Sequence, residues 1–226
     1  MTVACGIDLG TLRSLSYVAW LVDRDFVLDL YTPTIDEPLP TTPGGVPAAG
    51  VIAVDAPQGL PAPGRRRRVA DEWANTPTRV LPGTREELRS WPIYAGLIEA
   101  GVEVFWGAVE AGAARLHGLT AEAEPPLLAE TYPRYVIRRL WPGLPIPSKM
   151  RAPLEYVELL WPRLRELGYR CRSVERPYVG QLDAMLCAVA AEHLLDSVQL
   201  PVGQPEGAVE RLFHDGRQGP ESSFTG

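Results

Sequence analysis

Acidic residues end three apolar segments of the chain. VACGI runs into Asp8, VIAV into Asp55 and LLA into Glu130, and a glycine or proline follows each acid within three residues. A fourth acid, Asp183, stands in the first turn of a segment with helical apolar spacing, 181–195. Open α/β sheets bind ligands beyond the carboxyl ends of their strands. We therefore expect the four acids to meet at one edge of a sheet.

Such a cluster predicts metal chemistry. Two bare carboxylates about 4 Å apart repel each other by about 4 kcal/mol at an effective dielectric near 20. Protons or cations must offset this repulsion, and Mg²⁺ and Mn²⁺ prefer oxygen ligands. Two such ions, about 3.5–4 Å apart, can stabilise both the attacking and the leaving oxygen of a phosphodiester. Asp8, Asp55, Glu130 and Asp183 are thus candidate ligands for two Mg²⁺ or Mn²⁺ ions and candidate catalytic residues.

Basic residues near these acids suggest a phosphate-containing substrate. Lys149 is the only lysine, and we expect it to contribute to catalysis by neutralising phosphate charge. The run Arg65, Arg66, Arg67 and Arg68 follows shortly after Asp55 and predicts contact with nucleic acid. Simpler interpretations exist, because an arginine run is usually a solvated face and a single acid often caps a turn or a helix. The recurrence of strand-end acids favours a site.

Composition excludes several classes of protein. The 226 residues carry a net charge of −6, which argues against a general DNA-coating protein but not against a local basic groove. Hydrophobic residues make up 46%, enough for a sizeable core, and no apolar run is long enough to span a bilayer. The three cysteines lack metal-ligand spacing and the start lacks a leader, so we expect a reduced, cytoplasmic setting.

The predicted elements form a mixed α/β sheet flanked by helices. Apolar runs predict an antiparallel three-strand meander over 3–9, 14–22 and 26–31, followed by the proline-rich loop 32–50. The stretches 51–57 and 127–133 predict two further, parallel strands, which deliver Asp55 and Glu130 shortly before a proline. Residues 169–174 predict another strand. Predicted helices are 135–140, 153–167, whose apolar positions run from Leu154 to Leu167, and 181–195.

Residues 60–120 read as an insertion into this core. We predict a helix at 69–74, a capping box of Thr84 with Glu87, a helix at 93–100 ended by Gly101, a strand at 102–106 and a helix at 108–116. The predicted organisation is therefore one domain over 1–200 with this insertion. The tail, 201–226, is expected to be largely disordered apart from a short strand at 209–213.

Five short motifs carry a resemblance to a known family. In order they are GIDLG, AVDAPQGLP, ETYPR, PSK and QLDAMLCAVAA, and together they resemble an uncharacterised prokaryotic family of predicted ribonuclease H-like nucleases. The resemblance implies a ribonuclease H-like fold and a metal-dependent nuclease site at Asp8, Asp55, Glu130 and Asp183, with Lys149 nearby. It implies nucleic acid as the partner, without distinguishing DNA from RNA, and is compatible with a homodimer.

Two alternative functions remain open. GIDLGT also resembles the first phosphate loop of sugar kinases and actin-like ATPases, which would make the protein a nucleotide-binding phosphotransferase. Those proteins need two such domains, and this chain has room for one and shows no second Gly-rich phosphate loop. The other alternative is a catalytically silent module that binds nucleic acid or a protein. Retaining four acids at one site argues against it, because unpaired carboxylates are costly to keep.

Overall fold

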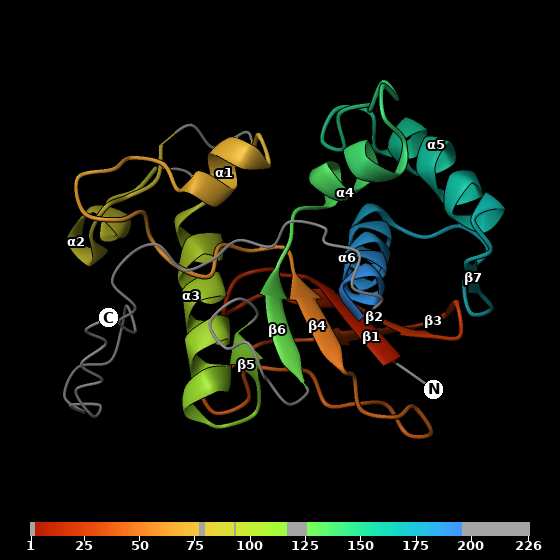
Figure 1. Ribbon diagram of the computed structural model, residues 1–226, viewed down its shortest axis with the longest axis horizontal. Helices are drawn as coiled ribbons and strands as arrows, with labels where there is room; N and C mark the ends of the chain where they lie inside the picture. The colour runs from red at the N-terminus through yellow and green to blue at the C-terminus, as the bar shows by residue number, and fades with distance from the viewer. Residues whose placement is uncertain (1–2, 77–79, 93, 117–125, 196–226) are drawn as a thin grey trace.

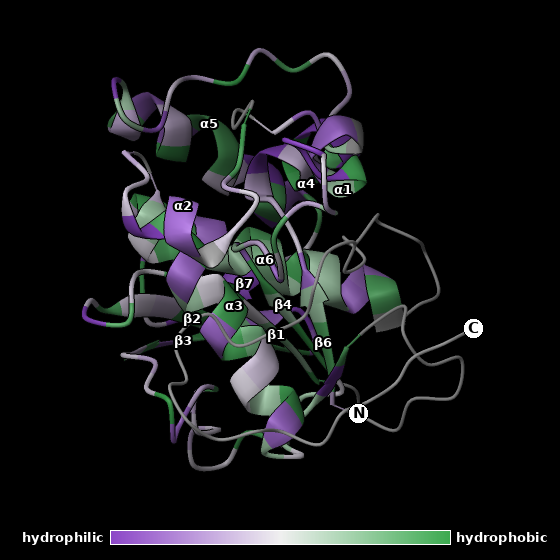
Figure 2. Ribbon diagram, turned by 90° about the vertical axis from the view of Figure 1, so that its left-hand side faces the viewer, coloured by the Kyte–Doolittle hydropathy of each residue, from purple (hydrophilic) through white to green (hydrophobic). Residues whose placement is uncertain are grey.

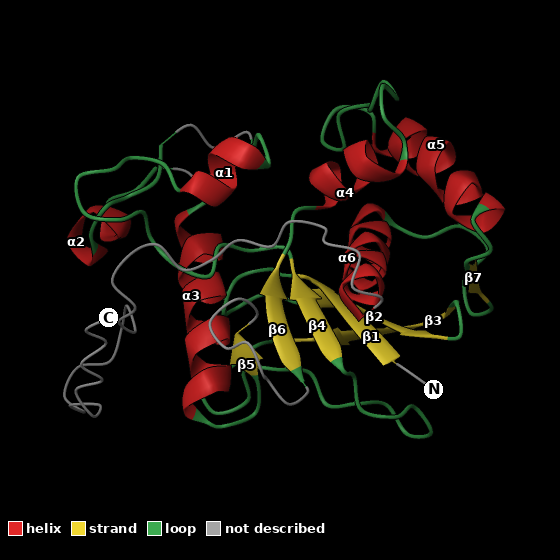
Figure 3. Cartoon of the chain, viewed as in Figure 1, coloured by secondary structure: helices red, strands yellow, loops and turns green. Residues whose placement is uncertain are grey.

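A mixed sheet forms the centre of the molecule. The computed structural model describes residues 3–76, 80–92, 94–116 and 126–195. In this part of the chain seven strands form one sheet in the order β5-β6-β4-β1-β2-β3-β7 (Figures 1 and 3). The predicted tail and its strand at 209–213 lie outside the described residues. Among the described helices, none has the length and apolar character needed to cross a membrane.

The strand pairing follows the predicted meander. β1 (Val3–Asp8), β2 (Ser16–Val22) and β3 (Asp25–Tyr31) pair antiparallel in sequence order. β4 (Val51–Val54) and β6 (Leu127–Glu130) extend the sheet in parallel from β1. Two-residue strands finish the edges, β5 (Arg115–Leu116) beside β6 and β7 (Arg170–Cys171) beside β3. β7 is shorter than the predicted strand 169–174, and residues 32–50 form neither helix nor strand, as predicted.

Helices cover both faces of the sheet. α6 (Val179–Leu195) lies on one face, with α4 (Pro133–Leu140) and α5 (Pro153–Glu166) packed against its outer side. α6 is therefore buried nearly all round, and its middle is rich in alanine and other small apolar residues. α3 (Ala95–Glu110) covers the other face, and the short helices α1 (Val69–Trp73) and α2 (Arg85–Arg89) lie near its amino end (Figures 1 and 2).

Alternation along the strands divides the core into two layers. On β4, Val51 and Ala53 pack in the cluster of α6, whereas Ile52 and Val54 pack in the cluster of α3. Successive side chains of a strand point to opposite faces, so a one-residue change of position changes the face. This parity determines where each strand-end acid points.

The segment 95–116 differs from its prediction. α3 is one continuous helix, so the predicted strand 102–106 is wrong. The predicted separate helix 108–116 is helical only over 108–110, as the end of α3, and its last two residues form β5. Its buried residues include Val104 and Phe105, which pack against the sheet, so this part of the predicted insertion belongs to the core. Gly101 does not end a helix. A Cβ at this position would stand 2.5 Å from the carbonyl oxygen of Pro57, so the glycine permits close packing.

Two other helical predictions hold in modified form. Thr84 caps α2 by accepting a hydrogen bond from the Glu87 amide, while the Glu87 carboxylate accepts from Gly83 rather than from Thr84. α5 begins at Pro153, as predicted. The middle of its predicted apolar face is buried, whereas Leu154 and Leu167 at the two ends are exposed. The residues that α5 buries are Tyr156, Val157, Leu160, Trp161 and Leu164.

A glycine on β1 lets α6 approach the sheet closely. A Cβ on Gly6 would stand 2.1 Å from both the carbonyl oxygen of Ala184 and the amide nitrogen of Ala188. Real Cβ atoms do not tolerate such distances, so any side chain here would push the helix away. Because Asp183 lies next to Ala184, this contact determines how near Asp183 comes to the end of β1.

Candidate active site

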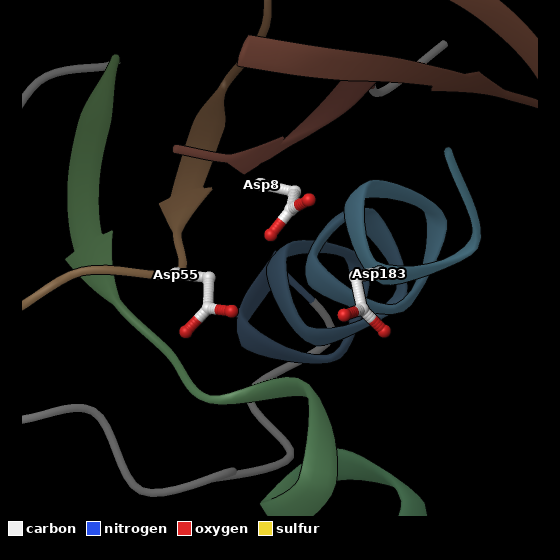
Figure 4. Close-up of side chains that lie close together, drawn as sticks. All are labelled: Asp8, Asp55 and Asp183. Atoms are coloured by element: carbon white, nitrogen blue, oxygen red, sulfur yellow. The ribbon is translucent and has the colours of Figure 1, made fainter. Parts of the chain in front are cut away.

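Three aspartates meet beyond the ends of β1 and β4. Asp8 ends β1, Asp55 follows β4 directly and Asp183 lies in α6. Each offers a carboxylate oxygen, and these oxygens lie within 4.8 Å of one another. Figure 4 shows the three carboxylates turned toward a common space. Asp183 is fully buried, whereas Asp8 and Asp55 are half-buried.

Strand register explains why Asp8 and Asp55 are neighbours. The parallel pairing of β1 with β4 aligns Ile7 with Val54, so the next residue on each strand is an aspartate. The amide of Asp55 donates to the carbonyl of Ile7 at 2.8 Å and continues the ladder. Ile7 and Val54 both face α3. Both aspartates therefore face α6, which delivers Asp183 to the same place.

Lys149 and Tyr156 hold the two oxygens of Asp183. The Lys149 ammonium lies 2.5 Å from Oδ2, and the Tyr156 hydroxyl donates to Oδ1 at 2.6 Å. Tyr156 is buried, while Lys149 retains about two fifths of its side-chain exposure. In the described part of the chain, no hydrogen bond or ion pair to the carboxylates of Asp8 and Asp55 is present. The prediction that Lys149 lies beside the acids is thus met in the geometry.

Burial and crowding change the protonation of this cluster. Burial, followed by the charges of Asp55 and Asp183, raises the pKa of Asp8 well above its usual value, although Lys149 opposes the shift. Burial also raises the pKa of Asp55; Lys149 counteracts it, Asp183 and Glu130 add to it, and the pKa reaches about 7. Burial would lower the pKa of Lys149, but the three aspartates outweigh it and raise that pKa. Lys149 is therefore a stable cation within the cluster.

Glu130 does not join the three aspartates. The β4–β6 register pairs Glu130 with Val54, so its side chain points to the α3 face, opposite to Asp55. There, Arg68 donates to both carboxylate oxygens at 2.6 and 2.7 Å, and the Gln58 amide donates at 3.0 Å. Arg68 also binds Asp71 through two hydrogen bonds. The predicted metal ligand is thus part of an ion-pair network that fixes residues 58–71 to the sheet.

The four-arginine run does not form one open basic surface. Arg68 is only 3% exposed and is bound to Glu130 and Asp71, so its predicted contact with nucleic acid is wrong. Arg67 donates to backbone carbonyls of Asp71 and Thr76 and is half-buried. Arg65 pairs with Glu72, and Arg66 is exposed. Much of the run therefore serves local structure.

Two backbone amides in the loop after β1 donate hydrogen bonds to nearby serine side chains. The Gly10 amide donates to the Ser16 hydroxyl at 3.0 Å, and the Thr11 amide donates to the Ser14 hydroxyl at 2.7 Å. Ser14 donates its amide back to the Thr11 carbonyl. A phosphate-binding loop needs such amides directed at the ligand. In this chain, two of these amides donate instead to serine side chains, one in the loop itself (Ser14) and one at the start of β2 (Ser16).

Sequence reasoning missed Tyr156 and the network of Arg68. Several sets of residues in α5 have apolar helical spacing, so the sequence does not reveal which face is buried. No neighbouring residue indicates that the Tyr156 hydroxyl binds Asp183. The pair Arg68 and Asp71 has i,i+3 spacing at the start of α1, which is a usable signal for a local ion pair.

Comparisons with family models, with curated proteins and with solved structures found no match for this chain.

Proposed function

We propose that the protein is a metal-dependent nuclease of ribonuclease H-like fold that hydrolyses phosphodiester bonds at Asp8, Asp55 and Asp183. The observation that carries the proposal is that three aspartates each offer a carboxylate oxygen within 4.8 Å of the others. Two of the aspartates stand at the ends of the parallel strands β1 and β4, and the third lies in α6. The strand order β3-β2-β1-β4-β6, with β2 antiparallel to the others, supports the fold assignment.

The donor set fits Mg²⁺ or Mn²⁺. All donors are carboxylate oxygens, which these hard cations prefer. Asp8 and Asp55 offer the oxygens that other groups leave accessible, whereas Asp183 already binds Lys149 and Tyr156. A divalent cation bound there would supply an activated water and charge stabilisation at the phosphoryl group.

Charge balance favours one ion together with Lys149. The three carboxylates carry −3 when ionised and the Lys149 ammonium +1, so the cluster is left with −2, which one divalent cation neutralises. The two ions expected from the sequence stay a prediction. In the one-ion arrangement, Lys149 is the second positive group, and it stabilises negative charge on the phosphoryl oxygens. Tyr156 keeps Asp183 oriented so that Lys149 remains at the site.

The loop after β1 argues against the nucleotide-binding alternative. The amides of Gly10 and Thr11, which a phosphate loop would direct at nucleotide, donate to Ser16 and Ser14 instead. Phosphodiester hydrolysis requires only the cation, the water and positive charge near phosphate.

The test is cleavage of labelled nucleic acid by the purified chain. Single-stranded and duplex DNA and RNA are incubated with Mg²⁺, Mn²⁺ or EDTA, and products are resolved on a denaturing gel. We expect cleavage with Mn²⁺ or Mg²⁺ and none with EDTA, and loss of cleavage in Asp55→Asn. Asp36→Asn, an exposed acid in the loop 32–50, is the matched control and should cleave like the wild type.

Two results would contradict the proposal. Cleavage that survives in Asp55→Asn would mean that a contaminating or different site acts. Complete absence of cleavage on every substrate, together with no effect of Mn²⁺ on thermal stability, would favour the catalytically silent module.

A further inference from the structure

The segment 131–154 departs from the charge of the rest of the chain. It contains five basic residues and no acidic residue, in a protein whose net charge is −6. The segment comprises α4 and the loop that leads to α5. We define the basic strip as its five positive side chains: Arg134, Arg138, Arg139, Lys149 and Arg151. A concentration of one sign of charge in an acidic protein is an electrostatic footprint that a polyanion would recognise.

The basic strip begins inside the candidate active site. Lys149 contacts Asp183 directly, at 2.5 Å. Tyr132 connects the two regions, because its phenol experiences the charge of Asp55 as well as those of Arg134 and Arg138. Burial, reinforced by Asp55 and opposed by these cations, raises the pKa of Tyr132, so it stays a neutral phenol. The contact of Lys149 with Asp183 therefore joins the segment 131–154 to the three aspartates.

Most of the strip is open to solvent. Arg134, Arg139 and Arg151 are exposed, and Met150, directly before Arg151, is 85% exposed. Arg134 donates to the Ile146 carbonyl, a contact that orients its guanidinium and leaves other N–H groups for a ligand. Arg138 donates to the carbonyl of Ala74, next to α1, and so joins α4 to α1, which the two perpendicular views place close together (Figures 1 and 2).

An exposed aromatic residue lies close in the chain to the end of α6 that borders the aspartates. Tyr178 is 73% exposed, directly before the first residue of α6. Two residues later, a Cβ on Gly180 would lie 2.9 Å from Oδ2 of Asp8, so this end of the helix borders the site. A large aromatic side chain with so much exposure has no packing role to explain it. An exposed aromatic side chain can stack on an unpaired base, and every base presents a face for stacking.

We infer that the basic strip and Tyr178 bind a single strand of nucleic acid and place its backbone across the three aspartates. This inference rests on the proposed function and adds two points to it: the substrate is a single strand, and the basic strip with Tyr178 is the surface that binds it. Phosphates contact Arg134, Arg139 and Arg151, and a base stacks on Tyr178. Stacking on Tyr178 requires an unpaired base, which a single strand offers and a duplex does not.

Binding without metal tests the inference separately from hydrolysis. Fluorescence anisotropy in EDTA measures the affinity of the full chain for a labelled single strand of about 20 nucleotides over a range of salt concentrations. The triple variant Arg134→Gln, Arg139→Gln, Arg151→Gln should bind at least about tenfold more weakly at low salt. The slope of log K against log salt should fall by about 2, because each lost phosphate contact accounts for about 0.7.

A matched triple variant controls for net charge. Arg89→Gln, Arg165→Gln, Arg170→Gln removes three exposed arginines elsewhere on the surface and should keep both affinity and slope. Tyr178→Ala should weaken single-strand binding about tenfold with the salt slope unchanged, because stacking releases no counterions. Its affinity for a duplex of the same sequence should not change.

Several outcomes would overturn the inference. Equal losses in the two triple variants would show a nonspecific effect of net charge. Duplex bound more tightly than single strand, or poly-glutamate competing as well as nucleic acid, would assign the strip to a duplex or to an acidic protein. If the wild type binds single strands but does not cleave them, the result supports the basic strip and counts against the proposed function alone. If the wild type cleaves and the strip variant binds as tightly as the wild type, the result counts against the basic strip alone.

Discussion

Two groups of acids occupy the same edge of the sheet but opposite faces. On the α6 face, Asp8, Asp55 and Asp183 crowd together with one cation, Lys149. On the α3 face, Glu130 and Asp71 share the buried guanidinium of Arg68, which donates hydrogen bonds to both. The α3 group is satisfied by fixed donors and serves to attach a segment. The α6 group is left with excess negative charge, and the pKa values of Asp8 and Asp55 are raised, which is the condition under which a cation binds.

The comparison shows that position at a strand end does not define a site. Glu130 and Asp55 follow similar apolar runs and stand before similar turns. Their strands are adjacent, yet the acids differ by one position in register, and this single step sends them to opposite faces. What each acid does is then decided by its partners, an arginine in one case and other carboxylates in the other.

The largest expected effect is the loss of cleavage when an acid on the α6 face, rather than one on the α3 face, is replaced. Asp8→Asn should reduce Mn²⁺-dependent cleavage by about 1,000-fold, since it removes a ligand and the charge that holds the cation. Glu130→Gln should leave Mn²⁺ affinity within about threefold, because its carboxylate is used by Arg68 and faces away from the aspartates. Cleavage rates and isothermal titration with Mn²⁺ check this pair. A strong loss of Mn²⁺ binding in Glu130→Gln would remove the distinction between the faces.

The second effect separates them by stability. Arg68→Met should destabilise the fold by about 3 kcal/mol, because it leaves two acids without their buried partner. Arg66→Met, at an exposed position in the same run, should change the free energy of unfolding by less than about 0.5 kcal/mol. Urea denaturation followed by circular dichroism measures both. Similar values for the two variants would mean that the α3-face network contributes little.

A smaller effect with opposite signs concerns Lys149. Lys149→Gln removes a positive charge from the cluster, so Mn²⁺ affinity should rise by about tenfold while cleavage falls by about tenfold or more. A purely structural lysine would lower both or neither. Titration calorimetry also gives the stoichiometry, for which we expect one ion per wild-type chain. Two ions bound to the wild type would contradict the role of Lys149 as the second positive group.

The smallest effect is a dependence on pH. Asp55 titrates near pH 7 in the folded protein and near 3.8 in its ordinary state, so the folded state holds a proton that the unfolded state releases between these values. The stability that this proton provides is present in full below pH 3.8 and is lost as pH rises through 7. Without metal, the melting temperature of the wild type should fall relative to that of Asp55→Asn between pH 4 and 7. Parallel curves for the two proteins would contradict the raised pKa.

Metal should reverse that trend. Because a proton and Mn²⁺ compete for the same carboxylates, the stabilisation by Mn²⁺ should increase from pH 6 to 8 in the wild type. In Asp55→Asn it should be weak throughout. Differential scanning fluorimetry with and without Mn²⁺ measures the difference, and Glu130→Gln should behave as the wild type does.

Much of the sheet was predictable because each strand carries its own pattern. The runs ending at Asp8, Asp55 and Glu130 are apolar and bounded by turn residues, and short connections dictate the antiparallel meander. α3 was not predictable in the same way. Gly101 looks like a helix end in the sequence, but its role depends on Pro57, which the fold brings within van der Waals contact. Long-range contact of this kind leaves no local signal.

The sequence indicates which acids stand at strand ends, but it does not indicate to which face of the sheet each acid points. Asp8, Asp55, Asp183 and Lys149 come together as the sequence suggested. The placement of Glu130 required the register between β4 and β6, which depends on how the two strands align and not on either alone. Arg68 illustrates the same limit, because a run of four arginines gives no sign of which one is buried.

Gly6 has no functional group, yet the whole arrangement relies on its lack of a side chain. α6 can pack this closely against the sheet only where β1 has no side chain, and the position of α6 determines the position of Asp183. Position 6 therefore serves as a marker when other sequences are sorted: a chain with the three aspartates but an alanine or larger residue there has its third acid displaced. Efforts to redesign the site should treat this residue as fixed before any charged position is varied.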